Sequence, residues 1–220
     1  MLNYQINNET NYLAFLNEAI VGVQDLLTTF AFSNQALADF NIAFGSTYNR
    51  EIALSLINQW QIGDFASFPQ FEIRSFPEIN GANGAYSVDT NKIYIAEEFL
   101  LANTGNLSAI VDLVLEEYGH FIDAQINSVD AKGNEGAIFS SLVQGETLNQ
   151  KQIEQFQAEN DIAVVNIDGQ EIIIEQNNFP KLFQQHLDLT TVNPNNSINI
   201  YHGSNDLDIF DLKSFDWRRW

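Results

Sequence analysis

Residues 106–127 read NLSAIVDLVLEEYGHFIDAQIN, which is the strongest helical pattern in the chain. Apolar side chains recur in it at steps of three and four residues, so the pattern predicts a helix that begins at Asn106 or Ser108 and ends near Asn127. Gly119, in the middle of this helix, is a poor helix former by about 1 kcal/mol. A glycine at this position makes sense if another segment of the chain packs closely on that turn.

The same helix carries polar side chains at the spacing of a metal site. At about 100° per residue, Glu116 and His120 lie about 40° apart, and Asp123 lies about 20° to the other side of Glu116. Glu117 lies about 60° from His120. In zinc peptidases, ligands at positions i and i+4 hold the ion and a glutamate at i+1 is the general base toward metal-bound water. The spacing therefore predicts Glu116 and His120 as ligands and Glu117 as the base, with a glutamate where the first histidine is usual.

A third metal ligand is expected from Glu135. This residue begins the next predicted helix, over residues 134–143, and a short loop would bring it back to the face that carries His120. Asp123 is expected to orient His120 or to cap that loop. Two simpler interpretations stay open: the acidic cluster could be a solvated helix face, and Glu135 could do no more than stabilise the positive end of its helix.

The remaining patterns predict an α+β fold. Residues 1–64 read as a helical N-terminal region, and strand-like segments at residues 71–74 and 85–96 predict a small antiparallel sheet before the motif helix. Two β-rich runs flank Asp168-Gly169, which is a strong type I′ turn signal and predicts a C-terminal β-hairpin.

The composition narrows the classes of partner and chemistry. Nine Lys and Arg against 29 Asp and Glu give a formal net charge of −20 at pH 7, which argues against nucleic acid or an anionic membrane as partner and suits a cation. The sequence has no cysteine, which excludes disulfides, cysteine-ligated zinc and thiol catalysis. No apolar run approaches the roughly 20 residues of a membrane span. The first eleven residues lack a secretory signal pattern, so any secretion is expected to proceed without an N-terminal signal peptide.

Two stretches resemble the core of a zincin metallopeptidase: GAYSVDTNKIYI at residues 84–95 and LVLEEYGHFID at residues 113–123. The usual zincin has histidine where Glu116 stands. More specifically, residues 80–176 are similar to a domain of large cyanobacterial proteins that often carry haemolysin-type calcium-binding repeats. That domain has the same Glu-Glu-x-Gly-His-x-x-Asp motif, the same Gly-Asn/Asp-Glu-Gly motif and a similar closing hairpin.

The resemblance implies a zinc-dependent peptidase domain over residues 65–176 that hydrolyses bonds in a peptide or protein substrate. Such a domain would process the larger secreted or toxin protein that contains it, or a partner. The strand over residues 93–95 would be the sheet edge that pairs with an extended substrate. The roles carried over are three zinc ligands, Glu116, His120 and Glu135, and one base, Glu117.

The alternatives to this hypothesis concern the metal and the activity. One histidine with two carboxylates makes a harder, more anionic site than the usual zinc site, so calcium or manganese could replace zinc, or the site could be inactive. The second hypothesis is a non-catalytic N-terminal module of a secreted, haemolysin-type calcium-binding protein. A peptidase needs an open groove beside residues 93–95, whereas a structural module would bury that edge. The sequence indicates no oligomeric state.

The last part of the chain carries a separate signal. Residues 177–199 are rich in Asn and Gln and read as a linker to a tail over residues 200–220. Within this tail, IYHGS at residues 200–204 resembles the opening strand of ADP-ribosyltransferase toxin domains, where a His-Gly-Ser/Thr turn holds the nicotinamide cofactor. The resemblance implies a truncated start of such a domain, unable to catalyse, in a fragment of a polymorphic toxin.

Overall fold

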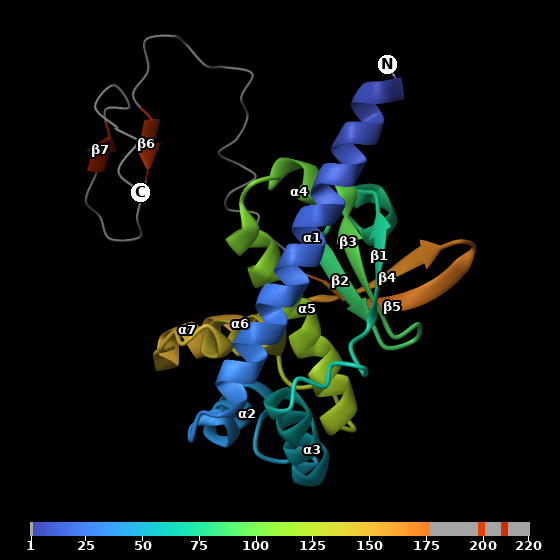
Figure 1. The fold of residues 1–220 in the computed structure, drawn as a ribbon. Coiled ribbons are helices and arrows are strands. Elements are labelled where there is room, and N and C mark those ends of the chain that lie inside the picture. Colours follow the sequence, from blue (N-terminus) through green and yellow to red (C-terminus); the bar gives the residue numbers. More distant parts are fainter. Residues whose placement is uncertain (1, 177–197, 201–207, 211–220) are drawn as a thin grey trace. The chain divides into compact units, whose positions relative to one another are not determined.

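The computed structural model describes residues 2–176, 198–200 and 208–210, and the chain divides into two units (Figure 1). Unit 1 is Met1–Phe179 and unit 2 is Pro180–Trp220. Within the described residues, unit 1 holds helices α1 to α7 and strands β1 to β5, and unit 2 holds strands β6 and β7. Helices and sheet together confirm the predicted α+β class.

Three helices form the N-terminal part of unit 1: α1 (Leu2–Ala31), α2 (Ala36–Phe44) and α3 (Arg50–Gln61). Aromatic rings pack them against α6 (Glu135–Val143). The ring of Phe139 on α6 contacts one ring from each of these helices. Its centroid lies 5.8 Å from that of Phe30 on α1, 5.9 Å from that of Phe40 on α2 and 6.3 Å from that of Trp60 on α3. The N-terminal helices therefore share one core with the helices of the motif region.

Five strands form one mixed sheet in the order β1-β3-β2-β5-β4. Their bounds are β1 (Gln70–Arg74), β2 (Gly84–Ser87), β3 (Lys92–Ala96), β4 (Ile162–Ile167) and β5 (Gln170–Gln176). β1 pairs parallel to β3, whereas the other three pairings are antiparallel, so the sheet is mixed and larger than the predicted antiparallel layer. β4 and β5 form the predicted hairpin, and φ values of 53° at Asp168 and 84° at Gly169 fit the type I′ turn.

The prediction that residues 93–95 form the sheet edge is wrong. β3 pairs with β1 on one side and with β2 on the other, and Ile93 and Ile95 are fully buried. The cause lies between the strands: the short 3-10 helix η1 (Phe76–Ile79) begins with a Ser75 capping box and leads the chain from β1 to β2. β1 therefore takes the outer position that the prediction gave to β3.

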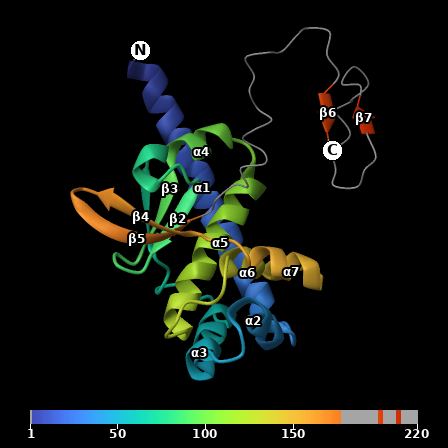
Figure 2. The ribbon, with the colours of Figure 1, turned by 180° about the vertical axis from the view of Figure 1, so that it is seen from behind.

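The motif helix is α5 (Leu107–Ile126), within one residue of the predicted bounds. It packs against α1, α6 and β2 (Figures 1 and 2). The remaining helices of unit 1 are α4 (Glu97–Ala102) and α7 (Gln150–Phe156). Because α5 touches helices on one side and the sheet on the other, most of its circumference is buried, including the four polar residues of the motif: Glu116, Glu117, His120 and Asp123.

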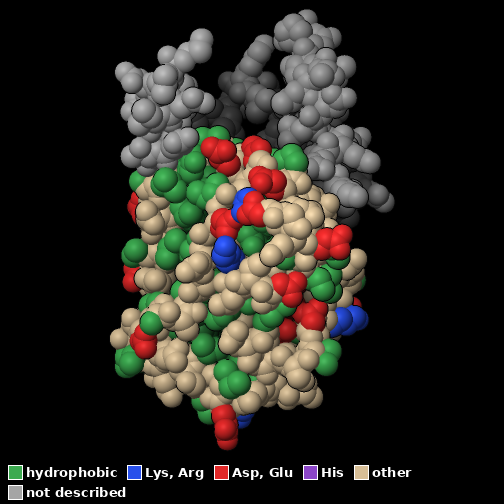
Figure 3. Space-filling view, turned by 90° about the vertical axis from the view of Figure 1, so that its right-hand side faces the viewer, with side chains coloured by type: hydrophobic (Ala, Val, Ile, Leu, Met, Phe, Trp, Pro, Cys, Tyr) green, Lys and Arg blue, Asp and Glu red, His purple; other side chains and the backbone are tan. Residues whose placement is uncertain are grey.

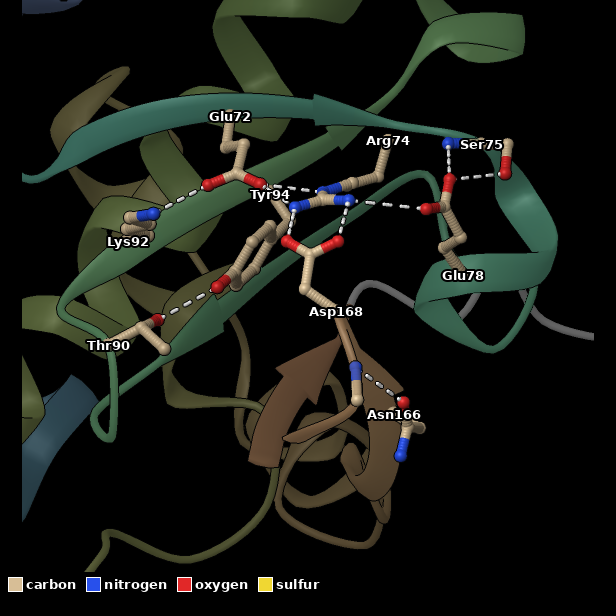
Figure 4. A network of polar contacts seen from close by, with 10 residues as sticks. Glu72, Arg74, Ser75, Glu78, Thr90, Lys92, Tyr94, Asn166 and Asp168 are labelled. Carbon is tan, nitrogen blue, oxygen red and sulfur yellow. Dashed lines mark hydrogen bonds and ion pairs between the residues drawn. The ribbon is translucent and has the colours of Figure 1, made fainter. Parts of the chain in front are cut away.

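The tip of the β4–β5 hairpin is held to the first strand by charge (Figure 4). The Arg74 guanidinium donates to both carboxylate oxygens of Asp168, over 3.2 and 2.5 Å, and also to Glu78 and Glu72. Lys92 Nζ adds an ion pair of 2.6 Å with Glu72. A bidentate arginine–carboxylate pair of this kind fixes geometry as well as charge, so the turn of the hairpin has a defined position over β1.

The surface of unit 1 reflects the composition. On the face drawn in Figure 3, acidic side chains are spread over the surface and basic ones are few. None of the helices in the described part of the chain is both long enough and apolar enough to cross a membrane.

The described residues of unit 2 form one antiparallel strand pair, β6 (Ile198–Ile200) with β7 (Asp208–Phe210). The predicted His-Gly-Ser turn at residues 202–204 lies outside the described residues, as does most of the predicted linker over residues 177–199.

Candidate metal centre

Four residues from four different elements bring potential metal ligands together inside unit 1. His120 lies in the middle of α5, Glu135 is the first residue of α6, Asp161 directly precedes β4, and Glu175 lies in β5. One ligand atom from each residue lies within 4.8 Å of those of the other three. We call these four residues the His120 cluster.

The contacts within the His120 cluster centre on the imidazole. Nδ1 of His120 lies 2.7 Å from Oε1 of Glu135 and 3.0 Å from Oε2 of Glu175, and Nε2 lies 4.0 Å from Oδ2 of Asp161. The side chains of His120 and Glu135 are fully buried, and those of Asp161 and Glu175 are 6% and 15% exposed. The cluster is therefore an interior site.

Several polar atoms of this interior have no hydrogen-bond partner among the described residues. They include Nε2 of His120, Oε2 of Glu135 and Oδ2 of Asp161. Buried polar groups are almost always paired, and an unpaired buried charge is far costlier than an unpaired neutral group. Three such atoms lie within one cluster, and these residue types are ones that could hold a cation together.

The electrostatics of the cluster are dominated by carboxylates. Burial by itself lowers the pKa of His120, but the adjacent Glu135 and Glu175 outweigh it and raise that pKa well above the usual value. Burial raises the pKa of Asp161, and Glu175 raises it further against the effect of His120. His120 lowers the pKa of both Asp161 and Glu135, against the effect of burial, so one histidine lies among three acidic side chains.

Two glycines explain how α5 and α6 approach closely enough to join His120 and Glu135. A Cβ at Gly119 would lie 2.6 Å from the Cα of Gly136, and a Cβ at Gly136 would lie 2.4 Å from the backbone oxygen of Glu116. The latter Cβ would also lie 2.8 Å from Nε2 of His120. Real Cβ atoms do not approach backbone this closely, so both positions require glycine. Close packing on the Gly119 turn was predicted from its poor helix propensity.

Of the predicted ligands, the structure brings His120 and Glu135 together but not Glu116. The Glu116 carboxylate instead accepts a hydrogen bond of 2.9 Å from the side-chain amide of Asn134, the residue that caps α6. That amide also donates to Glu159, and Oδ1 of Asn134 accepts from the Ala137 N–H over 2.8 Å. Glu116 thus contacts the cap of the neighbouring helix, one turn before the cluster.

Asp123 caps the loop between α5 and α6, one of the two roles expected for it. Its Oδ1 accepts from the side chain of Asn127 over 2.6 Å, and its Oδ2 accepts from the Ala131 N–H over 3.1 Å. Both oxygens of Asp123 are thus bonded to the loop, whereas Nδ1 of His120 is turned to Glu135.

Sequence reasoning missed Asp161 and Glu175. The register of the hairpin places Glu175 opposite Ile162, the residue after Asp161, so the two acids lie together at the open end. A signal was present: an acidic residue stands at each open end of a strongly predicted hairpin in the run DIAVVNIDGQEIIIEQ. Nothing in that run states that the open end packs against His120.

Glu117, the predicted base, lies fully buried one turn before His120. Neither of its carboxylate oxygens has a hydrogen-bond partner among the described residues. The backbone of β2 lies close above it, because a Cβ at Gly84 would come within 2.8 Å of Oε1 of Glu117. Burial raises the pKa of Glu117 well above the usual value, and neighbouring carboxylates such as Glu116 raise it further.

No family model, no curated protein and no solved structure matches this chain.

Proposed function

We propose that unit 1 binds one divalent metal ion through His120, Glu135, Asp161 and Glu175. The observation that carries the proposal is the buried convergence of four ligand atoms within 4.8 Å, three of whose residues have an unpaired polar atom. A divalent cation would neutralise the carboxylate excess and give each unpaired atom a partner. Four residues from helix, helix, loop and strand would then be joined through one ion.

Zinc is the ion that we propose. Imidazole nitrogen and carboxylate oxygen are both zinc ligands, and a closed set of four protein ligands is typical of a structural zinc site. Three carboxylates make this set harder than most, and manganese or calcium would favour such oxygens more strongly. The single imidazole favours zinc or manganese over calcium. The order of the chain's affinities for these three ions therefore tests whether the imidazole is one of the ligands.

A structural role for the ion follows from how the hairpin is attached. β5 pairs with β2 over two residue pairs, Ala85 with Gln176 and Tyr86 with Glu175. The ion would connect the open end of the hairpin to α5 and α6, while Arg74 holds the tip at the other end. This supports the hypothesis of a non-catalytic module, as does the interior position of β3.

Peptide hydrolysis is a second candidate, favoured by Glu117. A buried carboxylate with two unpaired oxygens, one turn from His120, is placed as a general base toward metal-bound water would be. A cleft of about 470 Å³ lies beside the same helix, lined in part by Asn83, Leu113 and Glu116. Neither Glu117 nor any residue of the His120 cluster lines this cleft, so hydrolysis would require the site to open.

Metal content of the full chain tests the binding proposal. The chain is loaded with zinc, dialysed and measured by elemental analysis, and we expect about one equivalent. Asp161→Asn keeps the side-chain volume but removes a ligand charge, and we expect its zinc affinity to fall at least about 100-fold. Glu116→Gln is the matched control, because it leaves an oxygen to accept from Asn134, and it should retain zinc. Loss of zinc in Glu116→Gln with retention in Asp161→Asn would overturn the proposed ligand set.

Cleavage of an unfolded protein substrate tests the second candidate on the same samples. A hydrolase predicts that Glu117→Gln retains zinc but loses cleavage by about 10²–10⁴-fold, the usual contribution of a general base. A zinc-loaded chain that cleaves no substrate would leave the ion with a structural role.

A further inference from the structure

One asparagine connects three of the four chain segments that carry the His120 cluster. Asn134 is the capping residue of α6, and its side chain is buried, at 4% exposure. Its Oδ1 accepts from the Ala137 N–H over 2.8 Å, and its amide donates to Glu116 over 2.9 Å and to Glu159 over 3.1 Å. A helix cap needs only the bond to Oδ1. The two amide bonds therefore serve something other than the cap.

The first amide bond fixes α6 against α5 at the level of the cluster. Glu116 lies on α5 one turn before His120, and Glu135 directly follows Asn134 on α6. Nδ1 of His120 and Oε1 of Glu135 lie 2.7 Å apart. The backbone contact at Gly136 sets the distance between the two helices, whereas a directional hydrogen bond also sets how far one helix can slide along the other.

The second amide bond holds the segment that leads to Asp161. The backbone N–H of Asn134 donates to the backbone oxygen of Phe156 at the end of α7, over 3.0 Å, and its side-chain amide holds Glu159 three residues later. Gly133 lets this segment approach, because a Cβ there would lie 2.4 Å from the same oxygen of Phe156. Asp161 follows Glu159 by two residues, which span at most about 7 Å. The position of Asp161 therefore depends on Asn134.

Such anchoring matters most in the metal-free chain. Three acidic side chains converge on one histidine in the His120 cluster, and like charges in a buried site repel. Groups that are held in place before binding lower the ordering penalty of the binding step. Bonds that hold the backbone around the cluster therefore favour capture of an ion, although they do not touch it.

We propose that Asn134 is a positioning residue of the metal site, and that its two amide bonds set the places of three ligands before an ion binds. These ligands are His120, Glu135 and Asp161. The inference rests on the proposed function. Oδ1 of Asn134 is engaged by the cap and its amide nitrogen can only donate, so Asn134 acts through its neighbours and not as a ligand.

The zinc affinity of the full chain, measured by competition with a chelator, tests the proposal. Asn134→Ser keeps an oxygen that can cap α6 but has no amide to donate to Glu116 or Glu159. Asn149→Ser is the matched control, because Asn149 caps α7 and its side chain accepts from the Gln152 N–H. We expect Asn134→Ser to bind zinc about 10–100-fold more weakly, the usual effect of losing a residue that orients metal ligands, and Asn149→Ser to bind it unchanged. A role limited to capping predicts no loss in either variant.

A second pair of variants alters the exposed acceptor instead of the buried asparagine. Glu159→Gln and Glu159→Ala both lose the charge of Glu159, but only Glu159→Gln keeps an oxygen that can accept from Asn134. We expect Glu159→Ala to bind zinc about fivefold more weakly than Glu159→Gln, the usual effect of one hydrogen bond. Because Glu159 is exposed, both variants should fold.

The outcomes separate this inference from the proposed function. Failure of the unaltered chain to bind zinc would overturn the metal site itself. Zinc binding by the unaltered chain, with equal affinities in Asn134→Ser and Asn149→Ser, would overturn the positioning role and leave the metal site. If Asn134→Ser does not fold, equal zinc affinities in the two Glu159 variants would overturn the positioning role.

Discussion

The contact between the backbones of α5 and α6 leads to a prediction with opposite signs at two glycines. Gly22 and Gly119 both lie inside long helices, where alanine is favoured over glycine by about 1 kcal/mol. A Cβ at Gly22 would lie 3.5 Å from Cγ2 of Val111, an ordinary contact. A Cβ at Gly119 would lie 2.6 Å from the Cα of Gly136, which is backbone and cannot rotate away. Gly22→Ala should therefore stabilise the chain and Gly119→Ala should destabilise it.

The size of the difference follows from the geometry. To restore an ordinary contact, the Cα of Gly136 must move from 2.6 to 3.4 Å, a shift of about 0.8 Å. Overpacking of a close-packed interior costs about 1–3 kcal/mol. Because the helix propensity gain is common to both variants, it cancels in their difference, and Gly119→Ala should be about 1–3 kcal/mol less stable than Gly22→Ala.

Urea unfolding of the two variants, followed by circular dichroism, measures this difference. The same shift moves Glu135, the residue before Gly136, away from His120, so Gly119→Ala should also bind zinc more weakly while Gly22→Ala binds it normally. If Gly119→Ala is as stable as Gly22→Ala, the close approach of the two helices is refuted.

Three further predictions concern ions and pH. Removal of the proposed ion by a chelator should lower the thermal midpoint of unfolding. A free ion concentration of about 1,000 times the Kd contributes about 4 kcal/mol, or about 8–16 °C for a chain of this size. Calorimetry measures the shift, and Asp161→Asn should show none. Arg74 lowers the pKa of Asp168 below the usual 3.8. The stability that Asp168 adds relative to Asp168→Asn is therefore present above pH 3.8 and is lost as the pH falls through the lowered pKa. Urea midpoints of the two chains from about pH 7 to about pH 2.5 measure this loss. Burial raises the pKa of Glu117 above the usual 4.5, so stability of the metal-free chain is lost as pH rises toward that raised pKa, and Glu117→Gln should gain most in urea midpoint at alkaline pH.

Each of these has an outcome that would contradict it. An equal chelator effect in Asp161→Asn would place the stabilising ion elsewhere. A stability difference for Asp168→Asn that persists at pH 2.5 would mean that the carboxylate does not act through charge. A Glu117→Gln variant whose advantage is the same at pH 5 and pH 8.5 would show that burial does not raise the pKa of Glu117 in the native chain.

Local signals account for the parts of the fold that sequence predicted well. The apolar steps of α5 and the Asp168-Gly169 turn each specify structure within a few residues, and both elements lie where they were predicted. The order of the strands depends on contacts between distant segments. Nothing in the sequence near Ile93 indicates that β3 lies beside β1, which precedes it in the chain. The sequence therefore predicted β3 as an edge strand.

The residues of the candidate site also divide into those that local sequence predicts and those that only tertiary packing brings together. Helical spacing shows which residues share a face of one helix, but it does not show which other segments pack against that face. It therefore grouped Glu116 with His120, whereas in the structure the side chain of Asn134 contacts the Glu116 carboxylate. Glu135 could be predicted because a short loop constrains where it returns. Asp161 and Glu175 lie more than forty residues after His120 in the chain, and only the tertiary packing brings them to it.

The distance along the chain between the residues of the His120 cluster has a consequence for biosynthesis. His120 and Glu135 emerge from the ribosome well before Asp161 and Glu175, and the hairpin that carries the last two can pair with β2 only after Gln176 has been made. Long-range pairings of this kind form late in folding. A complete set of the four candidate ligands therefore exists only in a chain whose sheet has closed, and capture of the proposed ion would mark the end of unit 1 assembly.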